Sequence, residues 1–249
     1  FDRMLEAVLA IGRAEDELKV SMANRPQAER PVYGRALFHL LHKHPVFAEG
    51  AINPVGLTLA RYMMGASCHL WNTSSLVKEG PVGTTRMHCD SMGVPTPLPP
   101  NGVVCNVSWI LTDYTKEKGT FCMVPSSHRW CRHPTDVDQP KFMGGPNDDD
   151  IGVPVEAAPG SLIVFHGNTW HGTYPKTDEG LRSHFVYMYA RNYVRPAERN
   201  DDIPDALIET YGPDFARLCG RAAWQGYGEE GPSLDGLKAA RAIQTGPFS

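Results

Sequence analysis

The sequence predicts a mainly β protein with flanking helices, in which the strands form an antiparallel double sheet or a barrel. From residue 66 to residue 193, short runs rich in Val, Ile, Thr, Trp and Tyr alternate with clusters of Gly, Pro and Asn. No helical pattern intervenes between these runs, which favours antiparallel pairing. Helical periodicity occurs only before and after this region.

The flanking helices are indicated by apolar spacing and by their end signals. Met4, Leu5 and Val8 begin an amphipathic pattern, with charged residues between the apolar ones. Pro54 stands in the first turn of another helix, and Gly65 follows its last turn. The predicted helices cover residues 4–20, 33–41, 54–64, 204–211 and 214–224.

The β region contains seven candidate strands. They cover residues 67–77, 84–90, 103–111, 120–124, 153–157, 161–165 and 182–193. Two proline-rich or polar stretches, residues 95–100 and 143–150, predict long loops. With 41% hydrophobic residues, the 249 residues predict a single domain with one core. We expect a helical lead-in over residues 1–65, a β core over 66–195 and a C-terminal helical segment over 196–249.

Composition limits the class of partner. The formal net charge is −4, and Lys and Arg are spread along the chain, so neither nucleic acid nor an anionic membrane is indicated. No apolar run approaches the roughly 20 residues of a spanning helix, and no signal-peptide pattern opens the chain, so we expect a cytoplasmic protein. The six cysteines form no CxxC pair, which favours reduced thiols over a zinc ribbon or a redox motif.

Residues 159–182 are the stretch around which the predicted site is built. An apolar strand over residues 161–165 follows a Pro-Gly turn, a polar loop carries His171, and a second strand begins near Arg182. A histidine just beyond one strand and an arginine entering the next can point into one cavity. Such a pair needs partners from elsewhere in the chain.

The partners are His88 and Asp90. In an extended segment, residues i and i+2 project to the same side, so one strand end can present an imidazole and a carboxylate together. With a distant histidine, either His166 or His171, they would form the 2-His-1-carboxylate arrangement of non-haem Fe(II). A closed zinc site would want a fourth ligand, and Cys89 points to the opposite face of a strand. Alone, the pair is also typical of a surface ion pair.

Arg182 favours His171 as the distal histidine. An arginine at the start of an otherwise apolar strand is costly to bury without an anion, and its guanidinium binds a carboxylate through two hydrogen bonds. A dicarboxylate cosubstrate would supply that anion. The alternative is a buried ion pair with an Asp or Glu of the chain.

Four ordered motifs resemble those of one family. They are the HxD at His88 and Asp90, WILTDYTKEKGTFCMVPSSHRW at residues 109–130, PGSLIVFHGNTWHG at 159–172, and an arginine eleven residues after His171. The chain resembles the phytanoyl-CoA dioxygenase family of Fe(II)/2-oxoglutarate oxygenases over residues 85–195. Residues 38–65 also resemble the helical lead-in of bacterial members.

The resemblance implies a fold and a site. The expected core is a double-stranded β-helix, or jelly-roll, of the cupin-like kind. His88, Asp90 and His171 are expected to be the catalytic residues that bind iron, and Arg182 to bind the far carboxylate of 2-oxoglutarate. Thr173 matches a hydroxyl that helps to hold that carboxylate.

Three further residues are cosubstrate candidates. Thr85 falls where some relatives carry a Gln that contacts 2-oxoglutarate. Asn106 and Ser108 alternate on the face expected to point inward, where either could touch the cosubstrate or the product. The sequence departs from the family where its usual PGSH turn appears as Pro125-Ser126-Ser127-His128.

The implied activity is that of an Fe(II)/2-oxoglutarate-dependent dioxygenase, which uses O2 and releases succinate and CO2. We expect hydroxylation of an unactivated C–H bond in a small molecule, whether a natural product, an acyl compound or an amino-acid-like compound. Asp90 favours hydroxylation over halogenation, because related halogenases replace that carboxylate with Ala or Gly. Desaturation, epoxidation and cyclisation stay open.

Two other classes also stay open: a cupin-type metal enzyme that does not use 2-oxoglutarate, and a binding protein without catalysis. The oligomeric state is left open between monomer and homodimer. The expected substrate-lining segments are Trp71, Trp170, residues 91–102, residues 131–150 and the C-terminal segment.

Overall fold

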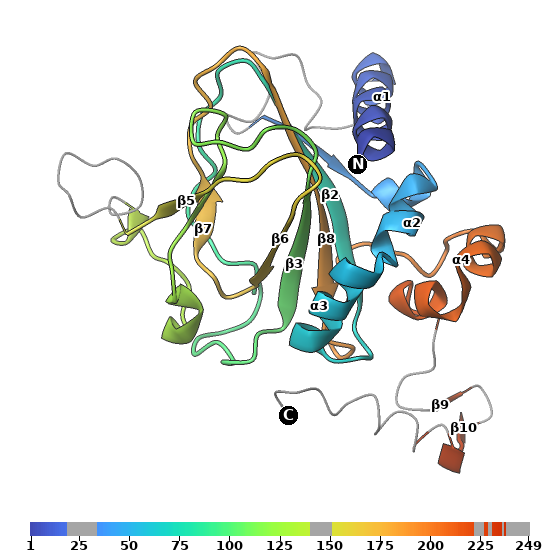
Figure 1. The fold of residues 1–249 in the computed structure, drawn as a ribbon. Helices are drawn as coiled ribbons and strands as arrows, with labels where there is room; N and C mark the ends of the chain where they lie inside the picture. Colours follow the sequence, from blue (N-terminus) through green and yellow to red (C-terminus); the bar gives the residue numbers. More distant parts are fainter. Residues whose placement is uncertain (19–33, 140–150, 222–226, 229–230, 236, 238–249) are drawn as a thin grey trace.

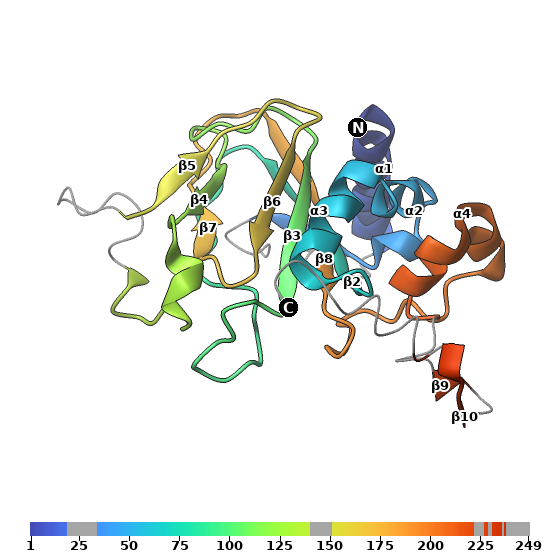
Figure 2. The ribbon, with the colours of Figure 1, turned by 60° about the horizontal axis from the view of Figure 1, so that its bottom comes forward.

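Two antiparallel β-sheets form the centre of the molecule (Figure 1). A computed structural model describes residues 1–18, 34–139, 151–221, 227–228, 231–235 and 237. The larger sheet has the strand order β1 (Arg35–Phe38), β2 (His69–Glu79), β8 (Leu181–Ala190), β3 (Val104–Ile110) and β6 (Leu162–His166). The smaller sheet has the order β5 (Val153–Val155), β4 (Phe121–Met123) and β7 (His171–Thr173). The smaller sheet lies beside β6 and β3 in Figure 2, and together the sheets form the expected jelly-roll.

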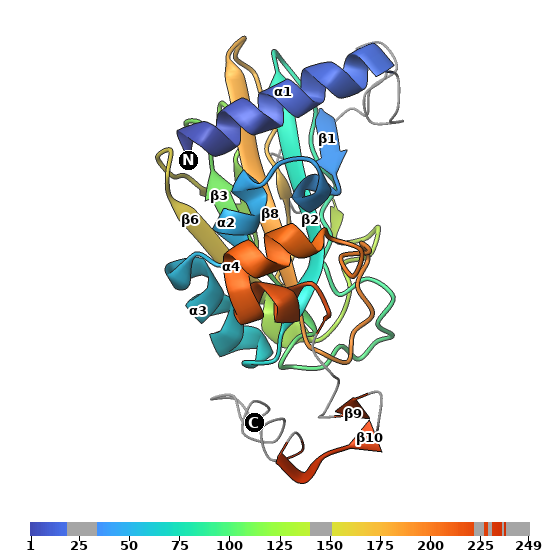
Figure 3. The same cartoon turned by 90° about the vertical axis from the view of Figure 1, so that its right-hand side faces the viewer.

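Helices cover the outer face of the larger sheet (Figure 3). They are α1 (Asp2–Leu18), α2 (Val46–Ala51), α3 (Pro54–Met64) and α4 (Asp205–Leu218). The chain also forms two 3-10 turns, η3 (Leu40–His42) before α2 and η4 (Ser127–Trp130), which follows β4 on the side of the smaller sheet. A two-stranded ribbon, β9 (Tyr227–Gly228) and β10 (Gly231–Pro232), follows α4. None of the helices that the structure describes is long and apolar enough to cross a membrane.

The start of α3 follows from its end signals. The side chain of Asn53 accepts hydrogen bonds from the backbone N–H groups of Val55 and Gly56, at 3.1 and 3.2 Å, and Pro54 occupies the first turn. The helix ends at Gly65, whose φ of 91° lies outside the helical range. The prediction for residues 54–64 is therefore confirmed.

Strand β8 contributes side chains to both faces of the larger sheet, because successive side chains of a strand point to opposite faces. Its outward-facing aromatic residues pack in the core beneath the helices, where the ring of Phe185 stacks on that of Phe47 with centroids 4.6 Å apart. The hydroxyls of Tyr187 and Tyr189 donate hydrogen bonds of 2.7 and 2.8 Å to carbonyl groups of α2. The other set, His184, Val186 and Met188, lines a cavity between the sheets. One strand thus anchors the helices and forms a wall of the site.

Three sequence predictions were wrong in type. The predicted helix at 33–41 is a strand over half of its described part: β1 occupies 35–38 and pairs with β2, and only residues 40–41 are helical, in the 3-10 turn η3, while residue 33 lies outside the described residues. Pairing between distant segments overrides the local helical pattern. Residues 84–90 form no strand, and within them only His88 makes an isolated bridge, to His171. His171 itself lies in strand β7 rather than in a loop.

The prediction of two helical segments near the end of the described chain is confirmed. The predicted helices at 204–211 and 214–224 correspond to two helical segments of α4, which are separated at Gly212, where φ of 77° and ψ of −167° lie outside the helical range. The predicted ends at 19–20 and 222–224 lie outside the described residues, as does the predicted loop at 143–150.

Candidate metal centre and cosubstrate pocket

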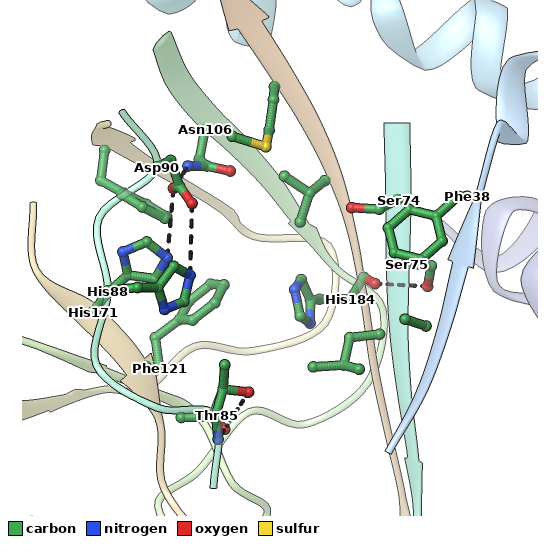
Figure 4. A pocket seen from close by; sticks show the side chains of 17 residues that line it. Phe38, Ser74, Ser75, Thr85, His88, Asp90, Asn106, Phe121, His171 and His184 are labelled. Carbon is green, nitrogen blue, oxygen red and sulfur yellow. Dashed lines mark hydrogen bonds and ion pairs between the residues drawn. The ribbon is translucent and has the colours of Figure 1, made fainter. Parts of the chain in front are cut away.

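The three predicted metal ligands converge at one end of the cavity (Figure 4). Nε2 of His88 lies 3.6 Å from one carboxylate oxygen of Asp90, and Nε2 of His171 lies 3.5 Å from the other. The possible ligand atoms of the three residues all lie within 4.8 Å of one another. Two backbone hydrogen bonds of 2.8 Å between His88 and His171 align the extended segment with β7.

Both imidazoles are held in the form that a metal needs. Nδ1 of His88 lies 2.8 Å from the carbonyl oxygen of Arg86, and Nδ1 of His171 lies 2.9 Å from that of Thr169. Each Nδ1–H therefore donates to a backbone carbonyl, which leaves the Nε2 lone pair facing Asp90. Burial lowers the pKa of His171 to about 4, against the opposing effect of Asp90, so the ring is neutral at pH 7.

Asn106 holds the carboxylate of the triad in place. Its side-chain amide donates a close hydrogen bond to the same oxygen of Asp90 that faces His171. The backbone N–H of Asp90 donates to the carbonyl of Gly167 at 2.7 Å. Asn106 therefore contacts a metal ligand, in addition to lining the cavity as predicted.

Arg182 is fully buried on the inner face of β8 and has no acidic partner among the described residues. One guanidinium nitrogen, Nη2, contacts the hydroxyl of Tyr114, and the guanidinium carbon lies 4.3 Å from the centre of that ring. Burial raises the pKa of Tyr114, so the phenol is neutral and offers no compensating charge. Nε and Nη1 of Arg182 have no hydrogen-bond partner within the described part of the chain. Unsatisfied donors on a buried cation indicate a missing anion.

Lys78 is a second buried cation, which the sequence prediction missed. It lies opposite Arg182 in the register of β2 and β8, and it is completely buried. Its ammonium group donates to the hydroxyl oxygen of Thr173 at 2.9 Å. Burial, Arg182 and Lys176 together lower the pKa of Lys78 to about 7. The only signal for Lys78 in the sequence is a lysine at a strand end, and its position beside Arg182 depends on the pairing of two strands.

Thr173 connects this pair of cations to the cavity, which it lines. Its hydroxyl oxygen accepts from Lys78 and from the backbone N–H of Thr85, at 2.9 Å in each case. It lies 3.2 Å from the hydroxyl of Thr85, to which it donates. The two predicted threonines therefore lie together at the end of the cavity nearest Arg182.

A family model described as phytanoyl-CoA dioxygenase matches residues 1–183. The chain belongs to the phytanoyl-CoA dioxygenase family. A dioxygenase of Aspergillus fumigatus, af480, is 30% identical over 186 residues, which cover 73% of this chain and 57% of that protein. A dioxygenase of Aspergillus aculeatus, aneA, is 25% identical over 222 residues, which cover 81% of this chain and 71% of that protein. The chain thus spans little more than half the length of the first relative.

Solved structures confirm the jelly-roll of this phytanoyl-CoA dioxygenase family member. The non-heme α-ketoglutarate-dependent epimerase SnoN from nogalamycin biosynthesis has a TM-score of 0.55 at 21% identity, over 80% of this chain and 79% of that one. HygX from Streptomyces hygroscopicus, with nickel and 2-oxoglutarate bound, has a TM-score of 0.54 at 19% identity, over 70% and 76% of the two chains. At these identities the likeness shows the fold.

The second candidate for the distal histidine points elsewhere in this family member. Nδ1 of His166 accepts from the backbone N–H of Asn168 at 3.0 Å, and its ring lies beside that of His128, with centroids 5.5 Å apart. His166 is not part of the cluster of possible metal ligands. The structure therefore brings His171, and not His166, to the HxD motif.

Ser108 and the residues expected to line the substrate site are not among the residues that line the described cavity. Ser108 is fully buried, and none of the residues that the structure describes forms a hydrogen bond with its hydroxyl. Trp170 is also fully buried, and its indole N–H donates to the carbonyl of Arg132 at 2.9 Å. Trp71 packs against an apolar cluster that includes Val186 and Met188, which line the cavity, but it is not itself among the described lining residues. The cavity is lined by Ala36, Phe38, Ser74, Ser75, Leu76, Thr85, His88, Asp90, Asn106, Phe121, Phe165, His171, Gly172, Thr173, His184, Val186 and Met188.

Proposed function

We propose that this protein is an Fe(II)/2-oxoglutarate-dependent dioxygenase that hydroxylates an unactivated C–H bond of a small, neutral molecule. The observation that carries the proposal is the pair of buried cations, Arg182 and Lys78, without a described carboxylate partner. They lie beside Thr173 and His184, which line the same cavity as the metal triad. A dianion that binds a metal at one end and a cation pair at the other fits this arrangement.

The donor set at the other end suits iron. Two imidazoles and one carboxylate form the facial set that binds non-haem Fe(II) and leaves coordination positions open. Bound together, Fe(II) and 2-oxoglutarate supply the activation of O2, with succinate and CO2 as products. His88, Asp90 and His171 would hold the metal, and Asn106, which donates to the carboxylate of Asp90, would fix the orientation of that carboxylate.

The chain's own residues position the cosubstrate. Arg182, Lys78 and Thr173 would bind its far carboxylate, so that its keto acid end is directed toward the triad. Phe121 and Phe165 line the cavity, and their rings lie beside His171, with centroids 6.1 and 4.8 Å away. These apolar walls exclude water from the reacting atoms.

The side of the cavity away from Arg182 supports a neutral substrate. Its described walls are the apolar side chains of Ala36, Phe38, Val186 and Met188, with Ser74 as a polar member. No Lys, Arg, Asp or Glu other than Asp90 lines the described cavity. Because a charged group would lose its hydration there without a partner, an uncharged natural product or acyl compound fits better than an amino acid.

The carboxylate of Asp90 supports hydroxylation over halogenation, since it occupies the position that a halide would need. Desaturation, epoxidation and cyclisation would use the same residues. Product analysis by mass spectrometry, with 18O2 as the oxidant, distinguishes these outcomes.

The deciding experiment is an anaerobic titration with Fe(II) and then with 2-oxoglutarate. We expect the weak visible charge-transfer band of chelated 2-oxoglutarate in the wild type, no band in His171→Ala, and a sharply raised 2-oxoglutarate requirement in Arg182→Ala. If Fe(II) binds and no band appears, the alternative of a cupin-type metal enzyme that does not use 2-oxoglutarate replaces this proposal.

A further inference from the structure

His184 is a buried polar residue to which the proposed chemistry gives no role. It lies on β8, two residues after Arg182 on the same face, and it is opposite Leu76 of β2. Its ring lines the cavity, across from His171 in Figure 4. The rings of Phe121 and Tyr114 pack against it edge-on, with centroids 5.0 and 5.7 Å away. His184 therefore lies between the cation pair and the metal triad.

The hydrogen-bonding state of the His184 ring can be derived from its surroundings. Nδ1 is buried and has no hydrogen-bond partner among the described residues. Burial, with Arg182 and Lys78 nearby, lowers the pKa of the ring well below its usual value, so the ring carries a single proton. A proton on Nδ1 would be a buried donor without an acceptor, which costs more than an unpaired lone pair there. The proton therefore belongs on Nε2, the nitrogen left to face the cavity.

We propose that His184 is a cosubstrate-binding residue, whose Nε2–H donates a hydrogen bond to a carboxylate oxygen of 2-oxoglutarate. A cosubstrate held by Arg182 at one end and by the triad at the other must pass the ring of His184. The inference rests on the proposed function. His184 would supply a neutral hydrogen-bond donor between Arg182 and the metal triad. Its other described neighbours there cannot do so, because Phe121 and Leu76 are apolar and the phenol of Tyr114 already contacts Arg182.

The test compares two substitutions of one side chain. His184→Ala removes the donor, whereas His184→Gln places an amide N–H close to the position of Nε2. In anaerobic titrations of the Fe(II)-loaded protein, we expect His184→Ala to raise the Kd for 2-oxoglutarate about tenfold or more, because a hydrogen bond to a charged group is lost. We expect His184→Gln to restore the Kd to within about threefold of the wild type, and the charge-transfer band to shift in His184→Ala.

Fe(II) affinity is the internal control, since His184 is not a metal ligand and both variants should bind Fe(II) as the wild type does. An unchanged Kd for 2-oxoglutarate in His184→Ala would overturn the proposal. Equal weakening in both variants would also overturn it, because the ring would then act only through its shape. A failure of the proposed function can be distinguished from a failure of this inference, since in the first case the wild type itself would show no charge-transfer band.

Discussion

Asn106 is the residue on which the geometry of the metal ligands depends most directly. Its amide is the described side-chain donor to Asp90, and both residues are almost completely buried. Partners of metal ligands typically change metal affinity by about 10- to 100-fold when they are removed. The carboxylate of Asp90 would otherwise be free to rotate away from His171.

We therefore expect Asn106→Ala to weaken Fe(II) binding by about 10- to 100-fold in an anaerobic titration. Ser108→Ala is the matched control, because Ser108 is the next inward residue of β3 and its hydroxyl has no hydrogen-bond partner in the ranges that the structure describes. Fe(II) affinity that is equal in the two variants would contradict the role assigned to Asn106.

Lys78 links the site to the pH dependence of stability. Its pKa is lowered from 10.5 to about 7 in the folded protein, chiefly by burial and then by Arg182. Between these two values the unfolded chain holds the proton and the folded chain does not. The contribution of Lys78 to the free energy of unfolding is therefore complete above the unfolded pKa of 10.5. It is lost as the pH falls from there to the folded pKa of about 7.

The expected result is that, without ligands, the free energy of unfolding rises with pH between about 7 and 10 because of Lys78. Lys78→Met should flatten this rise. Urea unfolding of the wild type and of Lys78→Met at several pH values measures the difference between their free energies of unfolding. The contributions of the other titrating groups cancel in this difference. Parallel profiles would show that Lys78 keeps its proton in the folded state.

At the level of single elements, the turn that begins η4 has a backbone conformation that favours glycine, yet the residue there is Ser126. Ser126, which stands where the family's usual turn has glycine, has a φ of 64°, in the left-handed region. A side chain there costs about 1–2 kcal/mol, whereas glycine adopts this conformation freely. Its neighbour Ser127 is buried, donates to the carbonyl of Val124 and accepts from the N–H of Trp170.

We expect Ser126→Gly to raise the free energy of unfolding by about 1 kcal/mol, as measured by urea denaturation. Ser127→Gly is the contrasting variant and should lower it by about 1–3 kcal/mol, because buried hydrogen bonds are lost. A destabilising Ser126→Gly would mean that the hydroxyl of Ser126 contributes more than the backbone conformation costs.

Taken as a whole, the molecule divides the site between its two sheets. The triad comes from β7 and the segment that pairs with it, whereas Arg182, Lys78 and Asn106 come from the larger sheet. A cosubstrate bound between the triad and the cation pair would therefore bridge the sheets. Ligands that bind only the folded state raise its free energy of unfolding by an amount that grows with the logarithm of the ligand concentration divided by Kd.

In anaerobic thermal unfolding, we expect Fe(II) alone to raise the Tm and 2-oxoglutarate to add a further increase only when Fe(II) is present. Arg182→Ala should keep the first increase and lose most of the second. An equal effect of 2-oxoglutarate with and without metal would show that the cosubstrate does not bridge the two parts of the site.

Local patterns in the chain are enough to predict an antiparallel double sheet or barrel, and four ordered motifs are enough to show the resemblance to the family, which implies the jelly-roll and the metal triad. Strands β3, β6 and β8 lie within three residues of their predicted ends, because each is a dense run of residues that suit a buried sheet. The HxD motif needs only an extended backbone, and the structure brings His88 and Asp90 together without a full strand. Arg182 stands out because a lone cation in an apolar run needs an anion.

The tertiary structure alone decided which distant residues share the cavity. Strand β1 exists because residues 35–38 pair with β2, and Lys78 faces Arg182 because of the register between β2 and β8. The unpartnered Nδ1 of His184 and the burial of Trp170 away from the cavity likewise depend on segments far apart in the chain. Strand register and burial are properties of pairs of segments, so no single segment contains the information that determines them.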